Sequence, residues 1–126
     1  MKSIRGAIAV VDNNELSIIS SAKSLILSVM KENNITEEDV VFALFTVTQD
    51  LDQAFPAKAF RELGMNSVAA IDTVAPNIKD DLAGCIRVLL TINNSSNDVK
   101  HVYLNDAKTL RPVSYTHLTL PTIYSV

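Results

Sequence analysis

The sequence predicts one α+β domain, a sheet covered on one face by one long and one short helix. Two observations carry this prediction. Apolar, β-branched runs alternate with a segment of helical periodicity along the chain. The length of 126 residues suits a single domain. With 48% hydrophobic and 20% charged residues, the composition is typical of a globular chain rather than a disordered one.

The first half of the chain predicts strand, long helix, strand. Residues 4–11 are aliphatic and β-branched, and the polar residues 12–14 that follow suit a helix cap. From 15 to 33 apolar residues recur at three- and four-residue steps, which predicts a long helix with one buried face. After a polar turn at 36–39, the apolar run 40–48 predicts a central strand buried on both faces.

The second half predicts a short helix and three strands. Pro56 suits the first turn of a helix that continues to Leu63, and Gly64 suits its end. The expected strands are 67–73, 84–92 and 99–104, with a break at 75–77, at most one helical turn at 79–83, a surface loop at 93–98 and a short helix or turn at 105–108.

Charge and cysteine content exclude several classes of function. The net charge of −3 argues against nucleic-acid binding, which needs a basic surface. The single cysteine, Cys85, cannot form an intrachain disulfide or a cysteine-based zinc site alone, and its apolar surroundings favour a buried hydrophobe over a reactive thiol. No run reaches the ~18 apolar residues of a membrane span, and the N-terminus lacks a secretory signal, so we expect a cytoplasmic protein.

Pattern alone leaves the charged side chains ambiguous. Arg87 interrupts an apolar strand, so it must reach solvent or be paired, and the pattern favours a solvated strand face. Lys58 and Arg61 share a helix face that is ordinarily solvated. Tyr103 favours the core, and Asp72 favours a turn.

Five segments in a fixed order change that balance: Ile4-Arg5-Gly6-Ala7, Phe55 to Leu63, Cys85-Ile86-Arg87-Val88-Leu89, His101-Val102-Tyr103-Leu104 and Leu110-Arg111-Pro112. Together they resemble the motif series of the AroH-type monofunctional chorismate mutases, over nearly the whole chain to about residue 112. That resemblance implies a ferredoxin-like α+β domain with a mixed sheet. It also implies a homotrimer whose sheets surround a barrel-like core, with three active sites at subunit interfaces.

The implied function is the Claisen-type rearrangement of chorismate to prephenate in phenylalanine and tyrosine biosynthesis, without cofactor or metal. The alternative from another class is a non-catalytic or divergent small-molecule-binding trimer of the same architecture, similar to the enamine/imine deaminases. The joint presence of Arg5, Arg87 and Tyr103 with the Phe-Pro-Ala-Lys-Ala segment favours the mutase.

The resemblance also assigns roles to residues. It places Arg87 against the breaking ether oxygen and a substrate carboxylate, and Arg5 and Tyr103 on a carboxylate. His101 is expected to be structural, because the rearrangement needs no base. The remaining substrate-binding positions are a pocket wall formed by Phe55, Ala57, Lys58 and Arg61, and a closing segment with Leu110 and Arg111.

One departure from the family pattern concerns a carboxylate. The family usually carries a glutamate between the lysine/arginine helix and the Cys-Ile-Arg strand, and Ala75 stands at that position here. Asp72 stands where many members carry a cysteine. We therefore expect Asp72 to be catalytic, orienting Arg87 and accepting a hydrogen bond from the substrate hydroxyl.

The last residues, 113–126, resemble one reading frame of a common transposase-type sequencing adapter. We therefore expect a chorismate mutase domain at 1–112 and a non-native tail after it, with a native tail as the alternative. His117, Tyr115 and Tyr124 accordingly receive no functional weight.

Overall fold

The computed structural model describes residues 1–93 and 98–109. Strands, helices and two 3₁₀ turns follow in the order β1 (Lys2–Ala9), α1 (Glu15–Glu32), η1 (Glu37–Asp39), β2 (Val40–Val47), α2 (Lys58–Glu62), β3 (Ala69–Val74), β4 (Ile86–Ile92), β5 (Val102–Asn105) and η2 (Asp106–Thr109). The α+β prediction with one long and one short helix is confirmed.

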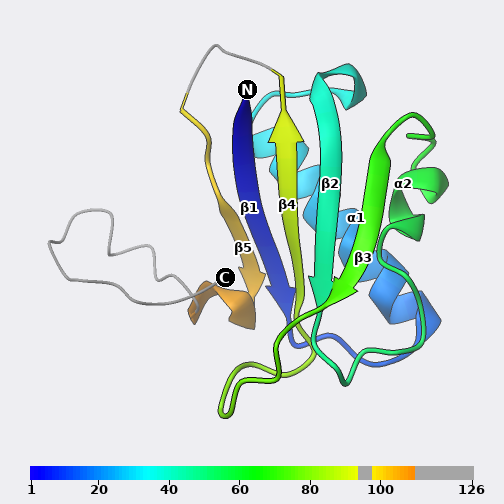
Figure 1. The fold of residues 1–126 in the computed structure, drawn as a ribbon, viewed down its shortest axis with the longest axis vertical. Coiled ribbons are helices and arrows are strands. Elements are labelled where there is room, and N and C mark those ends of the chain that lie inside the picture. The colour runs from blue at the N-terminus through cyan, green and yellow to red at the C-terminus, as the bar shows by residue number, and fades with distance from the viewer. Residues whose placement is uncertain (94–97, 110–126) are drawn as a thin grey trace, which may run out of the picture.

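The strands form one mixed sheet in the order β3-β2-β4-β1-β5 (Figure 1). β4 lies in the middle and is antiparallel to both neighbours, β1 and β2. The edge strands β3 and β5 run parallel to β2 and β1 respectively. The predicted central strand, β2, is therefore interior to the sheet but not its centre, and the prediction of burial on both faces was wrong, since Phe42 is 40% exposed.

The helix-covered face of the sheet holds the main core. α1 crosses behind the sheet, and α2 lies at its β3 edge (Figure 1). Asn14 caps α1, its side chain accepting a hydrogen bond from the Ser17 N–H at 2.7 Å. The residues buried between α1 and the sheet include Ile18, Ala22, Leu25 and Val29 from the helix and Ile4, Ile8, Phe45, Val88 and Leu90 from the strands.

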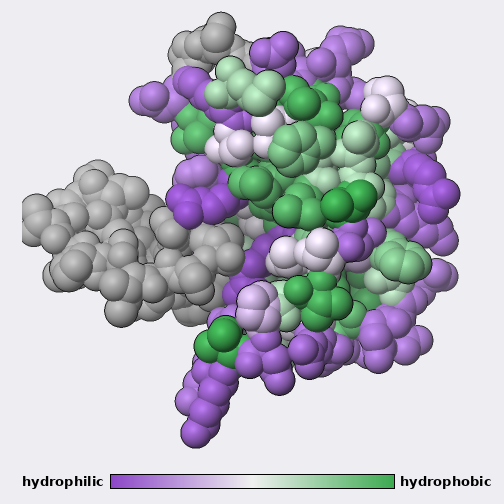
Figure 2. Space-filling view, in the orientation of Figure 1, coloured by the Kyte–Doolittle hydropathy of each residue, from purple (hydrophilic) through white to green (hydrophobic). Residues whose placement is uncertain are grey.

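Among the described elements, no α-helix covers the opposite side of the sheet, called here the open face (Figure 1). Laterally paired residues of a sheet point to the same side. One row across this face is Ile71, Leu44, Leu89 and Arg5, and the next is Thr73, Thr46, Arg87, Ala7 and Tyr103. Apolar side chains gather in the middle of this face (Figure 2).

The segment between β3 and β4 contains a turn at 79–80 and no helix, which is consistent with the prediction of at most one helical turn at 79–83. Asp80 adopts a left-handed conformation with φ of 64°, which interrupts helical geometry. Gly84 then takes φ of 58°, and a Cβ there would lie 2.7 Å from the Val11 carbonyl oxygen. The close approach allows the Val11 N–H to donate to the Gly84 carbonyl at 2.8 Å, which joins this loop to the end of β1.

Candidate active site

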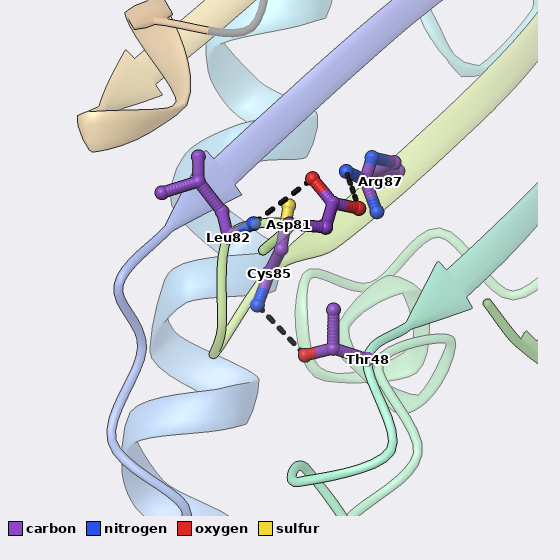
Figure 3. Close-up of polar contacts among 5 residues, drawn as sticks. All are labelled: Thr48, Asp81, Leu82, Cys85 and Arg87. Carbon is purple, nitrogen blue, oxygen red and sulfur yellow. Dashed lines mark hydrogen bonds and ion pairs between the residues drawn. The ribbon is translucent and has the colours of Figure 1, made fainter. Parts of the chain in front are cut away.

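Arg87 is a buried cation on the central strand. It lies on the open face, in the row with Thr46 and Ala7, and is 7% exposed. Its Nη2 pairs with Asp81 Oδ2 at 3.2 Å, and the two side chains point toward one another (Figure 3). Within residues 1–93 and 98–109 the buried Nε has no hydrogen-bond acceptor. The solvated strand face that the pattern favoured is therefore wrong.

The loop before β4 positions the carboxylate of Asp81. Its Oδ1 accepts a hydrogen bond from the Leu82 N–H at 2.9 Å, which leaves Oδ2 for Arg87. The loop is anchored just beyond this point, where the Cys85 N–H donates to Thr48 Oγ1 at 3.0 Å (Figure 3). The sequence interpretation missed Asp81. The available signal was an arginine inside an apolar strand, which requires a nearby carboxylate.

Two further predicted site residues share the open face with Arg87. Tyr103 of β5 stands in the same row, with Ala7 between them, and its hydroxyl oxygen is buried. Arg5 stands one row away, beside Leu89. The fold therefore brings Arg5, Arg87 and Tyr103 to adjacent rows of three neighbouring strands, although they are far apart in the sequence.

The predicted pocket wall lies elsewhere, around α2 at the β3 edge. A pocket of about 650 Å³ there is lined by Phe55, Lys58, Arg61 and Asp72 among other residues. Lys58 Nζ lies 3.7 Å from Glu15 Oε2 in an exposed ion pair. Lys23 of α1 pairs with Glu62 of α2 at 2.8 Å, and this hydrogen bond lowers the Glu62 pKa. Neither Arg5, Arg87 nor Tyr103 lines this pocket.

Asp72 does not orient Arg87 in this chain. It pairs with Phe45, whose side chain is in the core, whereas Arg87 pairs with Thr46, so the two side chains point to opposite faces of the sheet. Asp72 Oδ1 instead accepts the Ala57 N–H at 3.0 Å. Burial raises the Asp72 pKa, and the Ala57 hydrogen bond opposes that shift. The expected Asp72–Arg87 contact was therefore wrong within the protomer, and Asp81 holds that place.

The remaining observations concern Cys85, metal binding, membrane spans and the C-terminal residues. Burial raises the pKa of Cys85 to about 11, so the thiol is neutral near pH 7 and the prediction of a buried hydrophobe is confirmed. Over the described ranges, no group of three or more His, Cys, Asp or Glu side chains suits a metal ion. No described helix is long and apolar enough to cross a membrane. Leu110, Arg111 and the tail 113–126 lie outside the described residues.

Comparison with known proteins agrees with this arrangement. Residues 1–113 match the family described as chorismate mutase type I. The chain is 36% identical over 115 residues to the chorismate mutases AroH of Thermus thermophilus and Bacillus subtilis, covering 89% of this chain and 94% and 91% of theirs.

A solved structure gives the same result for the fold. The chorismate mutase from Clostridium thermocellum superposes with a TM-score of 0.84 at 38% identity, over 86% of this chain and 99% of that one. The catalytic function expected from the motif series is confirmed, and the deaminase-like alternative is not favoured. The chain belongs to the type I, AroH-type chorismate mutases, and is an isomerase of aromatic amino-acid biosynthesis.

Proposed function

We propose that chorismate is rearranged at sites shared between two subunits. Arg5, Arg87 and Tyr103 come from the open face of one subunit, and the α2 wall comes from its neighbour. The observation that carries this proposal is the separation of the two groups, one on the open face and one around the pocket at the β3 edge. Each group alone supplies only part of the charge that a dianionic substrate requires.

Arg87 acts on the charge that develops during the reaction. In a Claisen-type rearrangement the carbon–oxygen bond breaks ahead of carbon–carbon bond formation, so negative charge builds on the ether oxygen. No proton moves, and no covalent intermediate forms. A fixed donor at that oxygen is most stabilising in the transition state and is worth roughly 10²- to 10³-fold in rate. Holding the substrate folded in its reactive conformation supplies the other large contribution.

The hydrogen bonds of Arg87 support this role. Its Nη2 is committed to Asp81, whereas its buried Nε lacks an acceptor in the described part of the chain. Leaving a buried donor unsatisfied costs about 1–3 kcal/mol, so an acceptor that arrives with the substrate removes this cost. Asp81 is a positioning residue in this scheme, because it compensates the buried charge and fixes the plane of the guanidinium.

The neighbouring subunit supplies the wall and two further cations. Lys58 makes an exposed ion pair with Glu15, which is worth at most about 1 kcal/mol, so it can turn to a substrate carboxylate. Arg61 is exposed on the same short helix. Phe55, Ala57 and Asp72 complete the wall, with Asp72 as an acceptor for the substrate hydroxyl. Leu110 and Arg111 close over the pocket in this proposal.

The subunits associate through the open face in a homotrimer with a barrel-like core. Phe42 and Ile71 on this face are 40% and 64% exposed, and Leu44 and Leu89 lie beside them. A continuous apolar surface of this kind is typical of a subunit interface. The cytoplasm is the proposed compartment, which fractionation of the source cells would test.

Mixing two inactive variants tests the shared site. Arg87→Ala damages the open-face half, and Lys58→Ala damages the wall half. If the halves come from different subunits, mixed trimers contain some interfaces with both halves intact. After subunit exchange at equal amounts, about one quarter of the interfaces are intact, and roughly that fraction of wild-type chorismate consumption returns. Ultraviolet absorbance follows the substrate directly.

Controls separate this result from trivial ones. Each variant incubated alone under the same exchange conditions must remain inactive. A mixture of Arg87→Ala with Arg5→Ala must also stay inactive, because both changes damage the same half. If the first mixture recovers nothing while mixed trimers are demonstrated by mass spectrometry, the shared-site proposal is wrong.

A further inference from the structure

At Arg5, a hydrogen bond to a side chain takes the place of a main-chain hydrogen bond between β1 and β5. The parallel ladder between β1 and β5 begins with Gly6 opposite Val102. One step earlier, the slanted bonds of a parallel ladder would direct the Arg5 N–H to the Lys100 carbonyl. That carbonyl instead accepts a hydrogen bond from Asn33 Nδ2 at 3.0 Å.

Asn33 turns the main chain of Lys100 toward α1. This residue caps the C-terminus of α1, and its Nδ2 also donates to the Val29 carbonyl at 2.8 Å. Its Oδ1 accepts the Lys100 N–H at 2.7 Å, so both polar groups of Lys100 are held by one side chain. The Arg5 N–H, a backbone donor that needs an acceptor, bonds to a side chain of β5's leading segment instead.

The imidazole of His101 provides that acceptor. Its Nδ1 accepts the Arg5 N–H at 2.9 Å. A ring nitrogen accepts a hydrogen bond only when it carries no proton, so this contact requires the neutral imidazole with its proton on Nε2. The side chain thereby extends the β1–β5 ladder by one step, to the residue whose guanidinium belongs to the proposed site.

We infer that His101 is a positioning residue for Arg5, holding the backbone from which this guanidinium reaches the substrate carboxylate. The inference rests on the proposed role of Arg5. It adds that substrate affinity depends on a neutral His101. Protonation turns Nδ1 into a donor that faces the Arg5 N–H, so the hydrogen bond is lost and the start of β1 is released from β5.

Several charged groups lie near the ring. Lys31 and Glu32 from α1 and Lys108 from η2 line the same pocket as His101 and Tyr103. Lys100 precedes it in the chain, and Arg5 faces it from β1. Four of these groups are cations and one is an anion.

Steady-state kinetics on three variants tests the inference. His101→Ala should raise the KM for chorismate roughly threefold to tenfold near about pH 8, the effect of losing one hydrogen bond, with kcat nearly unchanged. His101→Asn should keep a wild-type KM, because the amide oxygen can accept without titrating. As the pH falls from about 8 to about 5, the wild-type KM should rise and that of His101→Asn should stay flat.

The other histidine of the chain is the matched control, and His117→Asn should follow the wild-type pH profile. A wild-type KM for His101→Ala near about pH 8 would overturn the inference. So would a His101→Asn profile that rises like that of the wild type.

Arg5→Ala separates this inference from the proposed function. A raised KM in Arg5→Ala with none in His101→Ala contradicts the role of His101 alone. A wild-type KM in Arg5→Ala contradicts both. In the Arg5→Ala background, the effect of His101→Ala should vanish, because the residue that it positions is absent. If the effect persists at full size, His101 acts through another group and the inference fails.

Discussion

At the scale of single residues, burial distinguishes the two arginines of the open face. Arg87 is 7% exposed and depends on Asp81 for charge compensation, whereas Arg5 is only half-buried. A buried guanidinium with a fixed partner cannot reorient freely, so its donors are already oriented before the transition state forms. The first two predictions concern Arg87 and its partner Asp81.

Replacing Arg87 with lysine should reduce kcat by about 10²-fold or more while the protein remains folded. Lysine keeps the charge but lacks the planar fork that holds Asp81 and a substrate oxygen together. Because the lost interaction belongs mainly to the transition state, kcat should fall more than KM rises. Circular dichroism and the chorismate assay measure both properties. A near-wild-type rate would remove Arg87 from the chemistry.

Asp81→Asn should lower kcat by roughly 10- to 100-fold and reduce stability by about 1–3 kcal/mol. The amide can still accept the Leu82 N–H, but it no longer neutralises the guanidinium, so a buried cation loses its charged partner. The neighbouring Asp80→Asn is the control, because Asp80 is exposed and asparagine tolerates its positive φ. Equal effects of the two substitutions would contradict a specific role for Asp81.

At the scale of elements, one hydrogen bond ties the β3 edge of the sheet to the pocket wall. Asp72 of β3 accepts the Ala57 N–H immediately before α2. This contact fixes where α2 begins, and therefore where Lys58 and Arg61 stand. The carboxylate is partly desolvated there, which is why its pKa is raised. The contact and the desolvation have opposite effects on stability.

Asp72→Asn should stabilise the folded protein slightly at neutral pH, whereas Asp72→Ala should destabilise it by about 0.5–1.5 kcal/mol. Asparagine keeps an acceptor for the Ala57 N–H without a charge to desolvate, and alanine removes the acceptor. A raised folded pKa means that wild-type stability is greatest with Asp72 protonated and falls as pH rises through that pKa.

The gain from asparagine should therefore disappear in acid, below the ordinary aspartate pKa. Thermal unfolding at acidic and neutral pH measures this difference. If Asp72→Asn is as damaging as Asp72→Ala at neutral pH, the carboxylate charge itself has a structural partner, contrary to this account.

At the scale of the whole molecule, the sheet has one covered face and one apolar open face. The helices bury the first face, and apolar side chains gather on the open face (Figure 2). Phe42 and Ile71 are among the exposed large hydrophobic residues. A chain of this size gains stability by covering such a surface with copies of itself. In the proposed trimer, the same association brings the two halves of the site together.

Ile71→Glu should therefore yield folded monomers without chorismate mutase activity. Ile71 is 64% exposed in the protomer, so glutamate is tolerated there, but it would bury a charge in the interface. Leu27→Glu is the control, since Leu27 is a 48% exposed residue of α1 and glutamate favours helix. Light scattering gives the oligomeric state. Active monomers of Ile71→Glu would refute the shared site.

The sequence by itself determined the element types and the family. Helical periodicity located α1, and apolar, β-branched runs located all five strands of the described residues, because these signals are local. The motif series identified a chorismate mutase, and the same spacing named Arg5, Arg87 and Tyr103 as a group before any contact between them was known. Some boundaries shifted by two or three residues where the chain beyond a strand bonds to another loop, as the Val11 N–H does in donating to the Gly84 carbonyl.

Only the tertiary structure decided which side chains meet. The sequence interpretation named Asp72 as the partner of Arg87 and missed Asp81, and the register between β2, β3 and β4 places Asp72 on the opposite face from Arg87. A shift of one residue in that register moves every side chain to the other face, and no local signal encodes it. The same holds for His101 and Arg5, which are far apart in the sequence and meet beside the Lys100 main chain that Asn33 of a distant helix binds. Such contacts depend on packing between segments far apart in the chain.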